Sequence, residues 1–172
     1  QGVIWLLSSV TYASLDNIID TAYSEGREPF VLMLDRITDV RNFGAIARTA
    51  ECAGIDAIIM AEKGNAPVSS DAMKTSAGAL NHLPICREKD LKRTLQFLHD
   101  NGMRIVAWTE KTDKEIYDAE LKGPVALVMG SEEDGISDSI LRTADELVKI
   151  PMKGKIGSLN VSVAAGVAIY EI

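Results

Sequence analysis

The sequence predicts an α/β protein with a mostly parallel sheet and helices on both faces. Short, solidly apolar segments alternate along the chain with segments whose apolar residues recur at helical spacing. Strands without polar alternation are buried on both faces, as in parallel sheets covered by helices. In such sheets ligands bind beyond the carboxyl ends of the strands. Three strand ends here lead into polar, glycine-containing loops, at residues 35–44, 130–137 and 151–160.

The elements are predicted from apolar runs and helical periodicity. Residues 1–10 are expected to form a strand or the end of a linker, and residues 13–25 a surface helix. The predicted strands are residues 30–34, 57–61, 83–86, 104–108, 125–129 and 147–150. Helices are predicted at residues 43–54 and 68–77, and around Leu91, Leu95 and Leu98, where Asn101-Gly102 ends the helix.

The carboxyl-terminal segment is apolar on all sides of a helix from Leu159 onward, which predicts burial. Ser158 and Asn160 are polar where a helix start needs capping. A buried helix whose first turn offers polar groups and free N–H donors is suited to holding a ligand.

Composition limits which classes of protein the chain can belong to. A chain of 172 residues with 47% hydrophobic residues fits one domain of ordinary size. The net charge of −7 argues against broad non-specific nucleic-acid binding but leaves room for a local basic patch. Cys52 and Cys86 lack metal or CxxC spacing, and neither a membrane span nor a signal peptide is visible. We therefore expect free thiols, no metal, no membrane and a cytoplasmic location.

The first loop leads into a helix that carries two arginines. Asn42 is expected to cap this helix, and Gly44, which has no side chain, to leave the backbone beside it accessible. Arg41 and Arg48 are two turns apart, so a helix extending back to Arg41 would place them together, opposite the apolar stripe. Two such guanidiniums could receive a phosphate or carboxylate. Simple solvation is the alternative for arginines on a polar face.

The other two loops are weak signals individually. Gly130 and Gly135 would let a ligand approach the backbone, whereas Glu133 and Asp134 fit a solvated turn. The acidic residues lack calcium-loop spacing. Gly154-Lys155 lacks the spacing of a nucleotide phosphate loop, which disfavours a generic nucleotide-binding protein.

Together, the three loops resemble a known set of motifs. Asn42-Phe43-Gly44 with Arg48, the stretch from Val128 to Ser137, and Ile150-Pro151-Met152 with residues 158–162 look like motifs 1, 2 and 3 of the SpoU (TrmH-like) RNA 2′-O-ribose methyltransferases. Residues 74–84 are similar to a segment of the bacterial 23S rRNA guanosine 2′-O-methyltransferases in that group. The resemblance covers residue 30 to the end of the chain.

The resemblance implies a fold, a cofactor and partners. Members of this SPOUT superfamily fold as an α/β domain whose carboxyl-terminal part makes a deep trefoil knot, and they form homodimers. S-adenosylmethionine binds at the knot, held largely by backbone groups. By position, the implied cofactor-binding residues are Thr109, Leu127, Met129, Gly130, Ile150, Met152, Ser158 and Leu159. The implied substrate is RNA, with a guanosine of 23S rRNA favoured over tRNA.

The resemblance also implies catalytic residues: Asn42, Arg48, Glu132, Ser158 and Asn160. The pKa of an arginine, above about 12, makes a general-base role for Arg48 demanding. We expect Arg48, with Arg41 as a further RNA contact, to hold the phosphate beside the target ribose. Asn42 would orient Arg48 or the 2′-hydroxyl, and Glu132 would pair with Asn42 or Arg48. Ser158 and Asn160 would complete the pocket.

The amino-terminal end departs from the 23S enzymes, which usually carry an RNA-binding domain there. The chain begins Gln1-Gly2 without methionine, so we expect a fragment or processed piece. Residues 1–13 are interpreted as a linker remnant and residues 14–172 as the catalytic domain, which would bind cofactor but methylate RNA poorly. A non-catalytic RNA-binding or dimerisation module is the alternative from another class.

Overall fold

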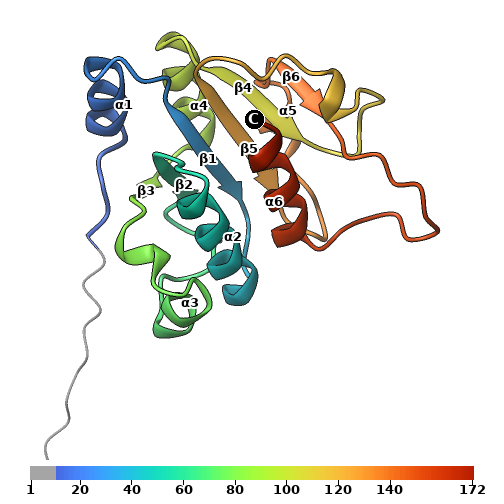
Figure 1. Ribbon diagram of the computed structural model, residues 1–172, viewed down its shortest axis with the longest axis horizontal. Coiled ribbons are helices and arrows are strands. Elements are labelled where there is room, and N and C mark those ends of the chain that lie inside the picture. Colours follow the sequence, from blue (N-terminus) through green and yellow to red (C-terminus); the bar gives the residue numbers. More distant parts are fainter. Residues whose placement is uncertain (1–10) are drawn as a thin grey trace, which may run out of the picture.

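The computed structural model describes residues 11–172, so the expectation for residues 1–10, and with it most of the predicted linker remnant, lies outside the described residues. Six parallel strands form one sheet in the order β3-β2-β1-β5-β4-β6 (Figure 1). The strands are β1 (Phe30–Asp35), β2 (Ala57–Ala61), β3 (Ile85–Glu88), β4 (Arg104–Trp108), β5 (Val125–Gly130) and β6 (Glu146–Val148). All six predicted strands are confirmed, although β3 and β6 are displaced by one or two residues at their ends.

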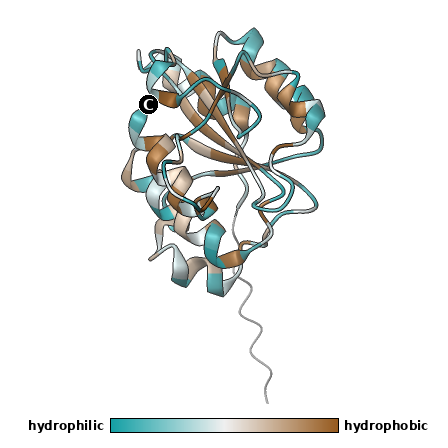
Figure 2. Cartoon of the chain, turned by 90° about the vertical axis from the view of Figure 1, so that its right-hand side faces the viewer, coloured by the Kyte–Doolittle hydropathy of each residue, from teal (hydrophilic) through white to brown (hydrophobic). Residues whose placement is uncertain are grey.

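Helices cover both faces of the sheet, as predicted. Alternate residues of β1 divide the core: Leu32 and Leu34 face one cluster, whereas Val31 and Met33 face the other. The first cluster lies under α2 (Val40–Cys52), α3 (Ser70–Thr75), α6 (Val161–Glu171) and the short helices η1 (Ala79–Asn81) and η2 (Ile116–Asp118). The second lies under α1 (Leu15–Ser24), α4 (Leu91–Asp100) and α5 (Asp138–Leu141), and Figure 2 shows the apolar residues gathered along the strands between the layers.

Helix α2 begins three residues earlier than predicted, and its cap differs. The side chain of Asp39 accepts a hydrogen bond from the backbone N–H of Asn42 at 2.7 Å, so Asp39 and not Asn42 is the N-cap. The prediction for Asn42 was wrong because the helical phase extends back to Val40. As a result, Asn42 lies in the first turn and its amide is available for other contacts.

Helix α6 packs beside α2 (Figure 1). It is only partly buried in the single chain. Asn160 caps it as predicted, accepting from the backbone N–H of Ser162 at 3.0 Å. Ala164, Ala165, Ala168 and Ile169 are buried. In contrast, Val163 is 53% exposed and Tyr170 is 67% exposed, so burial on all sides is not reached within one chain. The trefoil knot stays a prediction.

Both cysteines are free thiols. Cys52 is exposed, whereas Cys86 is buried in β3. Burial, together with the nearby charge of Glu88, raises the pKa of the Cys86 thiol to about 12, so this thiol is protonated and unreactive at neutral pH. Among residues 11–172, no helix has both the length and the apolar character that a membrane crossing requires.

Candidate functional site

A cavity of about 600 Å³, called the main cavity below, lies beyond the carboxyl ends of β4, β5 and β6 and beside the start of α6. Its volume suits a small organic ligand. The walls come from four segments of the chain: residues 108–111, residues 129–135, Lys149 with Ile150 and Met152, and residues 157–161 with Ala164. This is the edge of a parallel sheet at which ligands are expected.

Three predicted residues from distant parts of the chain meet at one rim of this cavity. A single oxygen of Glu132, Oε1, accepts hydrogen bonds from Asn160 Nδ2 at 2.8 Å, from Val161 N at 2.9 Å and from Asn42 Nδ2 at 3.5 Å. Asn160 Nδ2 also donates to Asn42 Oδ1 at 3.0 Å. We call Asn42, Glu132 and Asn160 the Asn–Glu–Asn junction. It joins the starts of α2 and α6 to the loop that follows β5, so the predicted convergence of the three loops is confirmed.

The loop after β5 reaches this position because two glycines let its backbone fold tightly. A Cβ atom on Gly130 would lie 2.1 Å from the carbonyl carbon of Gly135, a distance that no side chain tolerates. Gly135 itself has a positive φ of 65° and donates its N–H to the carbonyl of Ser131 at 3.0 Å. The compact turn holds Glu132 over the start of α6.

Most of the predicted cofactor-binding residues lie at the main cavity. Its lining includes Thr109, Met129, Gly130, Ile150, Met152, Ser158 and Leu159. Leu127 is the exception: it is fully buried within β5, in the core cluster that faces α2 and α6, and does not reach the cavity. Sequence reasoning missed Trp108, Lys111 and Lys149, which also line it. Their signal was available, since Trp108 is the last residue of a predicted strand, Lys149 lies in the last predicted strand, and Lys111 follows three residues after a strand end.

The two arginines of α2 lie apart from the Asn–Glu–Asn junction and outside the lining of the main cavity. Arg41 and Arg48 are both exposed on the helix, away from buried Phe43 and Ile46, so the predicted polar face is confirmed. Neither lines the main cavity, and within residues 11–172 neither side chain makes a hydrogen bond or an ion pair. Arg48 is six residues beyond Asn42 and therefore points in another direction around the helix. Arg48 therefore does not border the main cavity within this chain, and its role at the phosphate beside the target ribose stays a prediction.

The lining of the main cavity fits a partly apolar ligand that carries a positive charge. Four carboxylates, of Glu110, Glu132, Glu133 and Asp134, stand against the two lysines, giving a formal charge of −2. Met129, Ile150 and Leu159 supply apolar surface. Among the described residues, the backbone N–H groups of residues 152–159 donate to no other protein group, so they are available to a ligand.

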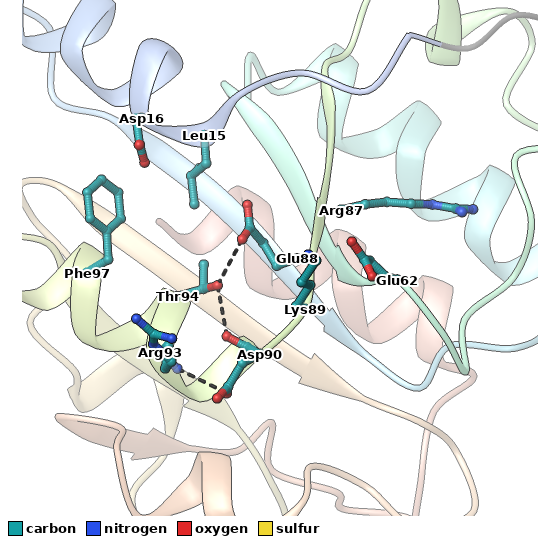
Figure 3. Close-up of a pocket in the computed structure, with 10 residues that line it drawn as sticks. All are labelled: Leu15, Asp16, Glu62, Arg87, Glu88, Lys89, Asp90, Arg93, Thr94 and Phe97. Atoms are coloured by element: carbon teal, nitrogen blue, oxygen red, sulfur yellow. Dashed lines mark hydrogen bonds between the residues drawn. The ribbon is translucent and has the colours of Figure 1, made fainter.

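A second cavity, of about 400 Å³, lies between α1, the end of β3 and α4. Figure 3 shows Asp16, Glu62 and Glu88 around it, with Glu88 directed toward Thr94. It contains none of the predicted site residues, and it is lined by no glycine. No cluster of three or more histidine, cysteine or carboxylate side chains suited to a metal is found in the described part of the chain.

Comparison with known proteins decides the family. Residues 29–170 match the SpoU rRNA Methylase family. The chain belongs to this family. The resemblance of the three loops to the SpoU motifs is thereby confirmed, and the spatial convergence of those loops explains why residues so far apart in sequence form one set of motifs.

Relatives and solved structures of the SpoU family support the same assignment. The chain is 40% identical over 156 residues to a 23S rRNA (guanosine-2′-O-)-methyltransferase of Vibrio parahaemolyticus, covering 91% of this chain and 63% of that protein. It is 38% identical over 172 residues to an uncharacterized tRNA/rRNA methyltransferase of Synechocystis, covering 100% of this chain but 45% of the relative. The chain thus spans less than two thirds of these relatives.

One similar solved structure contains a cofactor. The SpoU methyltransferase AviRb of Streptomyces viridochromogenes, solved in complex with AdoMet (S-adenosylmethionine), aligns with a TM-score of 0.77 and 30% identity. The alignment covers 84% of this chain and 57% of that one. This similarity supports the predicted α/β architecture of the SpoU family.

Proposed function

We propose that this chain transfers the methyl group of S-adenosylmethionine to a ribose 2′-hydroxyl of RNA, and that the nucleotide is a guanosine of 23S rRNA. The Asn–Glu–Asn junction at the rim of the main cavity carries this proposal, because it unites the three SpoU motifs around one space. An rRNA substrate implies action in the cytoplasm. The named activity of the Vibrio relative supports the choice of substrate.

The main cavity suits the methyl donor on its own properties. S-adenosylmethionine carries a sulfonium and an ammonium group, which the carboxylate-rich lining favours, and an adenosine whose faces need apolar contacts. Thr109, Met129, Gly130, Ile150, Met152, Ser158 and Leu159 would hold it. When bound, it supplies a methyl group on an already activated leaving group, so alignment of the acceptor oxygen can provide much of the rate acceleration.

The polar residues would position the acceptor. Glu132 Oε1 accepts from three N–H donors, so we assign Glu132 the role of orienting Asn42 and Asn160. The amide of Asn42, fixed from both sides, would orient the 2′-hydroxyl. Ser158, exposed at the cavity wall, would contact the ribose or the donor.

A homodimer is part of this proposal. Val163 and Tyr170 leave apolar surface on α6 that a second copy would cover. Arg48 is exposed and does not line the cavity of its own chain, so in this proposal a second copy presents it to the 2′-oxygen. We expect inactive Arg48→Ala and inactive Asn160→Ala chains to regain methylation when they are mixed and allowed to exchange subunits. Continued inactivity of the mixture would exclude a shared site.

Titration with S-adenosylmethionine followed by methylation tests the function. Calorimetry should show binding of one donor per chain, and labelled donor should mark extracted rRNA in preference to tRNA. Replacement of Asn160 by Ala should abolish transfer. Absence of donor binding would favour a non-catalytic RNA-binding module, whereas labelling of tRNA alone would move the substrate to tRNA.

A further inference from the structure

The end of β1 contains two charged residues that lie outside the SpoU motifs quoted above. Asp35 is the last residue of β1 and pairs in register with Gly130 of β5. Its side chain is 7% exposed, and its Oδ2 accepts a hydrogen bond from the backbone N–H of Ser137 at 2.7 Å. Asp35 therefore holds the far end of the loop whose near end begins at Gly130.

Arg36 follows in a backbone conformation that side chains rarely adopt. Its φ is 61°, in the left-handed region that favours glycine. From there its guanidinium reaches across the same loop: Nη1 donates to Asp134 Oδ2 at 3.2 Å and Nη2 donates to the carbonyl of Gly135 at 3.1 Å. A strained residue persists when its contacts offset the strain, and such residues concentrate at functional sites.

The loop at residues 130–137 is thus held from two sides. Glu132 ties its first half to the starts of α2 and α6, whereas Asp35 and Arg36 tie its second half to the end of β1. Residues 130–135 form one wall of the main cavity. A displacement of the second half would therefore change the shape of that wall even with the Asn–Glu–Asn junction intact.

We propose that Asp35 and Arg36 are positioning residues for the methyl donor, acting through the loop at residues 130–137. This inference rests on the proposed function, because it assigns the main cavity to S-adenosylmethionine. Neither residue lines the cavity, so each acts on the donor through the backbone of residues 134–137.

Loss of the Arg36 charge cannot by itself explain weaker binding of the donor. Loss of a cation beside Asp134 would leave the cavity wall more negative, which by itself would favour a cationic donor. Asp134 is 68% exposed at its side chain and Arg36 40%, so solvent screening limits this gain to a few-fold at most. A weaker affinity for the donor would therefore report the position of the loop.

The variant Arg36→Gly separates binding from stability. Glycine adopts the positive φ without strain, and this gain offsets the loss of the ion pairs of Arg36 with Asp35 and Asp134, so the melting temperature should change little. Without the guanidinium the second half of the loop samples other positions. If about one molecule in ten keeps the binding-competent arrangement, the dissociation constant for S-adenosylmethionine rises about tenfold. Arg36→Lys, which keeps a single charged donor, should bind with intermediate affinity.

Arg27 provides a matched control. It is a surface arginine that also contacts two carboxylates, of Glu25 and Asp56, but lies far from the main cavity in the turn before β1. Arg27→Ala should leave the dissociation constant for S-adenosylmethionine unchanged in calorimetric titration of the full chain. Asp35→Asn should weaken binding in the same direction as Arg36→Gly.

The outcomes distinguish this inference from the proposed function. Failure of the unaltered chain to bind S-adenosylmethionine would remove the proposed function itself. Binding by the unaltered chain, with equal affinity for Arg36→Gly, would overturn only the positioning role. A large fall in melting temperature for Arg36→Gly would also overturn it, since the contacts would then serve stability in general.

Discussion

Two cavities lie at the carboxyl edge of the same parallel sheet, and the carboxylates that line them differ in their hydrogen bonding. In the main cavity, Glu132 shares one oxygen among three N–H donors from two helix starts. In the second cavity, the Glu88 carboxylate accepts one hydrogen bond from residues 11–172, a long one from Thr94 at 3.4 Å, and it shares the cavity with Asp16 and Glu62 (Figure 3). A position at the carboxyl edge of the sheet is therefore not enough to distinguish a candidate functional site. The main cavity differs because distant loops converge there on a carboxylate whose oxygen is fully hydrogen-bonded.

Replacement of Glu132 or Glu88 by alanine should give the largest difference in methyl-transfer rate between the two cavities. Glu132→Ala removes the acceptor of Val161 N and one of the two acceptors of Asn160 Nδ2, which keeps only Asn42 Oδ1. Hydrogen bonds to a charged group contribute about 1.5–3 kcal/mol each. We expect the rate of methyl transfer to rRNA, measured with labelled donor, to fall at least about 100-fold. Glu88→Ala is the control and should stay within about twofold. Equal losses in both variants would show that the two cavities do not differ in function.

Glycine substitution tests whether the tight loop makes the main cavity. Gly130→Ala places a methyl group 2.1 Å from the Gly135 backbone, so the loop must shift. The dissociation constant for S-adenosylmethionine should rise about tenfold, and the free energy of unfolding should fall by about 1–3 kcal/mol in denaturant titration. Gly154→Ala is the matched control, because a Cβ there meets nothing within 4 Å and its φ is not positive. Unaltered binding by Gly130→Ala would contradict this account of the wall.

The second cavity should affect the pH dependence of stability and not the rate of methyl transfer. Burial raises the pKa of Glu88, the Thr94 hydroxyl lowers it in part, and the charges of Asp16 and Glu62 raise it further. The folded chain therefore binds this proton more tightly than the unfolded chain, and stability is lost as the pH rises from the ordinary glutamate pKa through the raised one.

Glu88→Gln removes that titration. The variant should equal the unaltered chain in melting temperature below the ordinary pKa of glutamate. At neutral pH it should be the more stable by less than about 1 kcal/mol, because the carboxylate is only partly buried and solvent screens it. A variant less stable than the unaltered chain at neutral pH would show that ionised Glu88 contributes favourable contacts.

Local sequence patterns determined the strands, the helices that cover them and the members of the site. Apolar runs identify β1 and β5 because parallel strands are buried on both faces, and Asn160 could be recognised as a cap from its position before an apolar helix. The three polar loops were identifiable as one set because each follows a strand of the same sheet. The resemblance to the SpoU motifs then attached a chemistry to that set.

Tertiary structure alone decided how those members face one another. Asp39 and not Asn42 caps α2, because the start of a helix depends on competing side chains in the folded loop. Leu127 lies in the core and Arg48 does not line the main cavity, since strand pleat and helix phase fix directions that linear spacing does not give. The contact of Arg36 with Asp134 and Gly135 spans almost one hundred residues, and no local pattern encodes it.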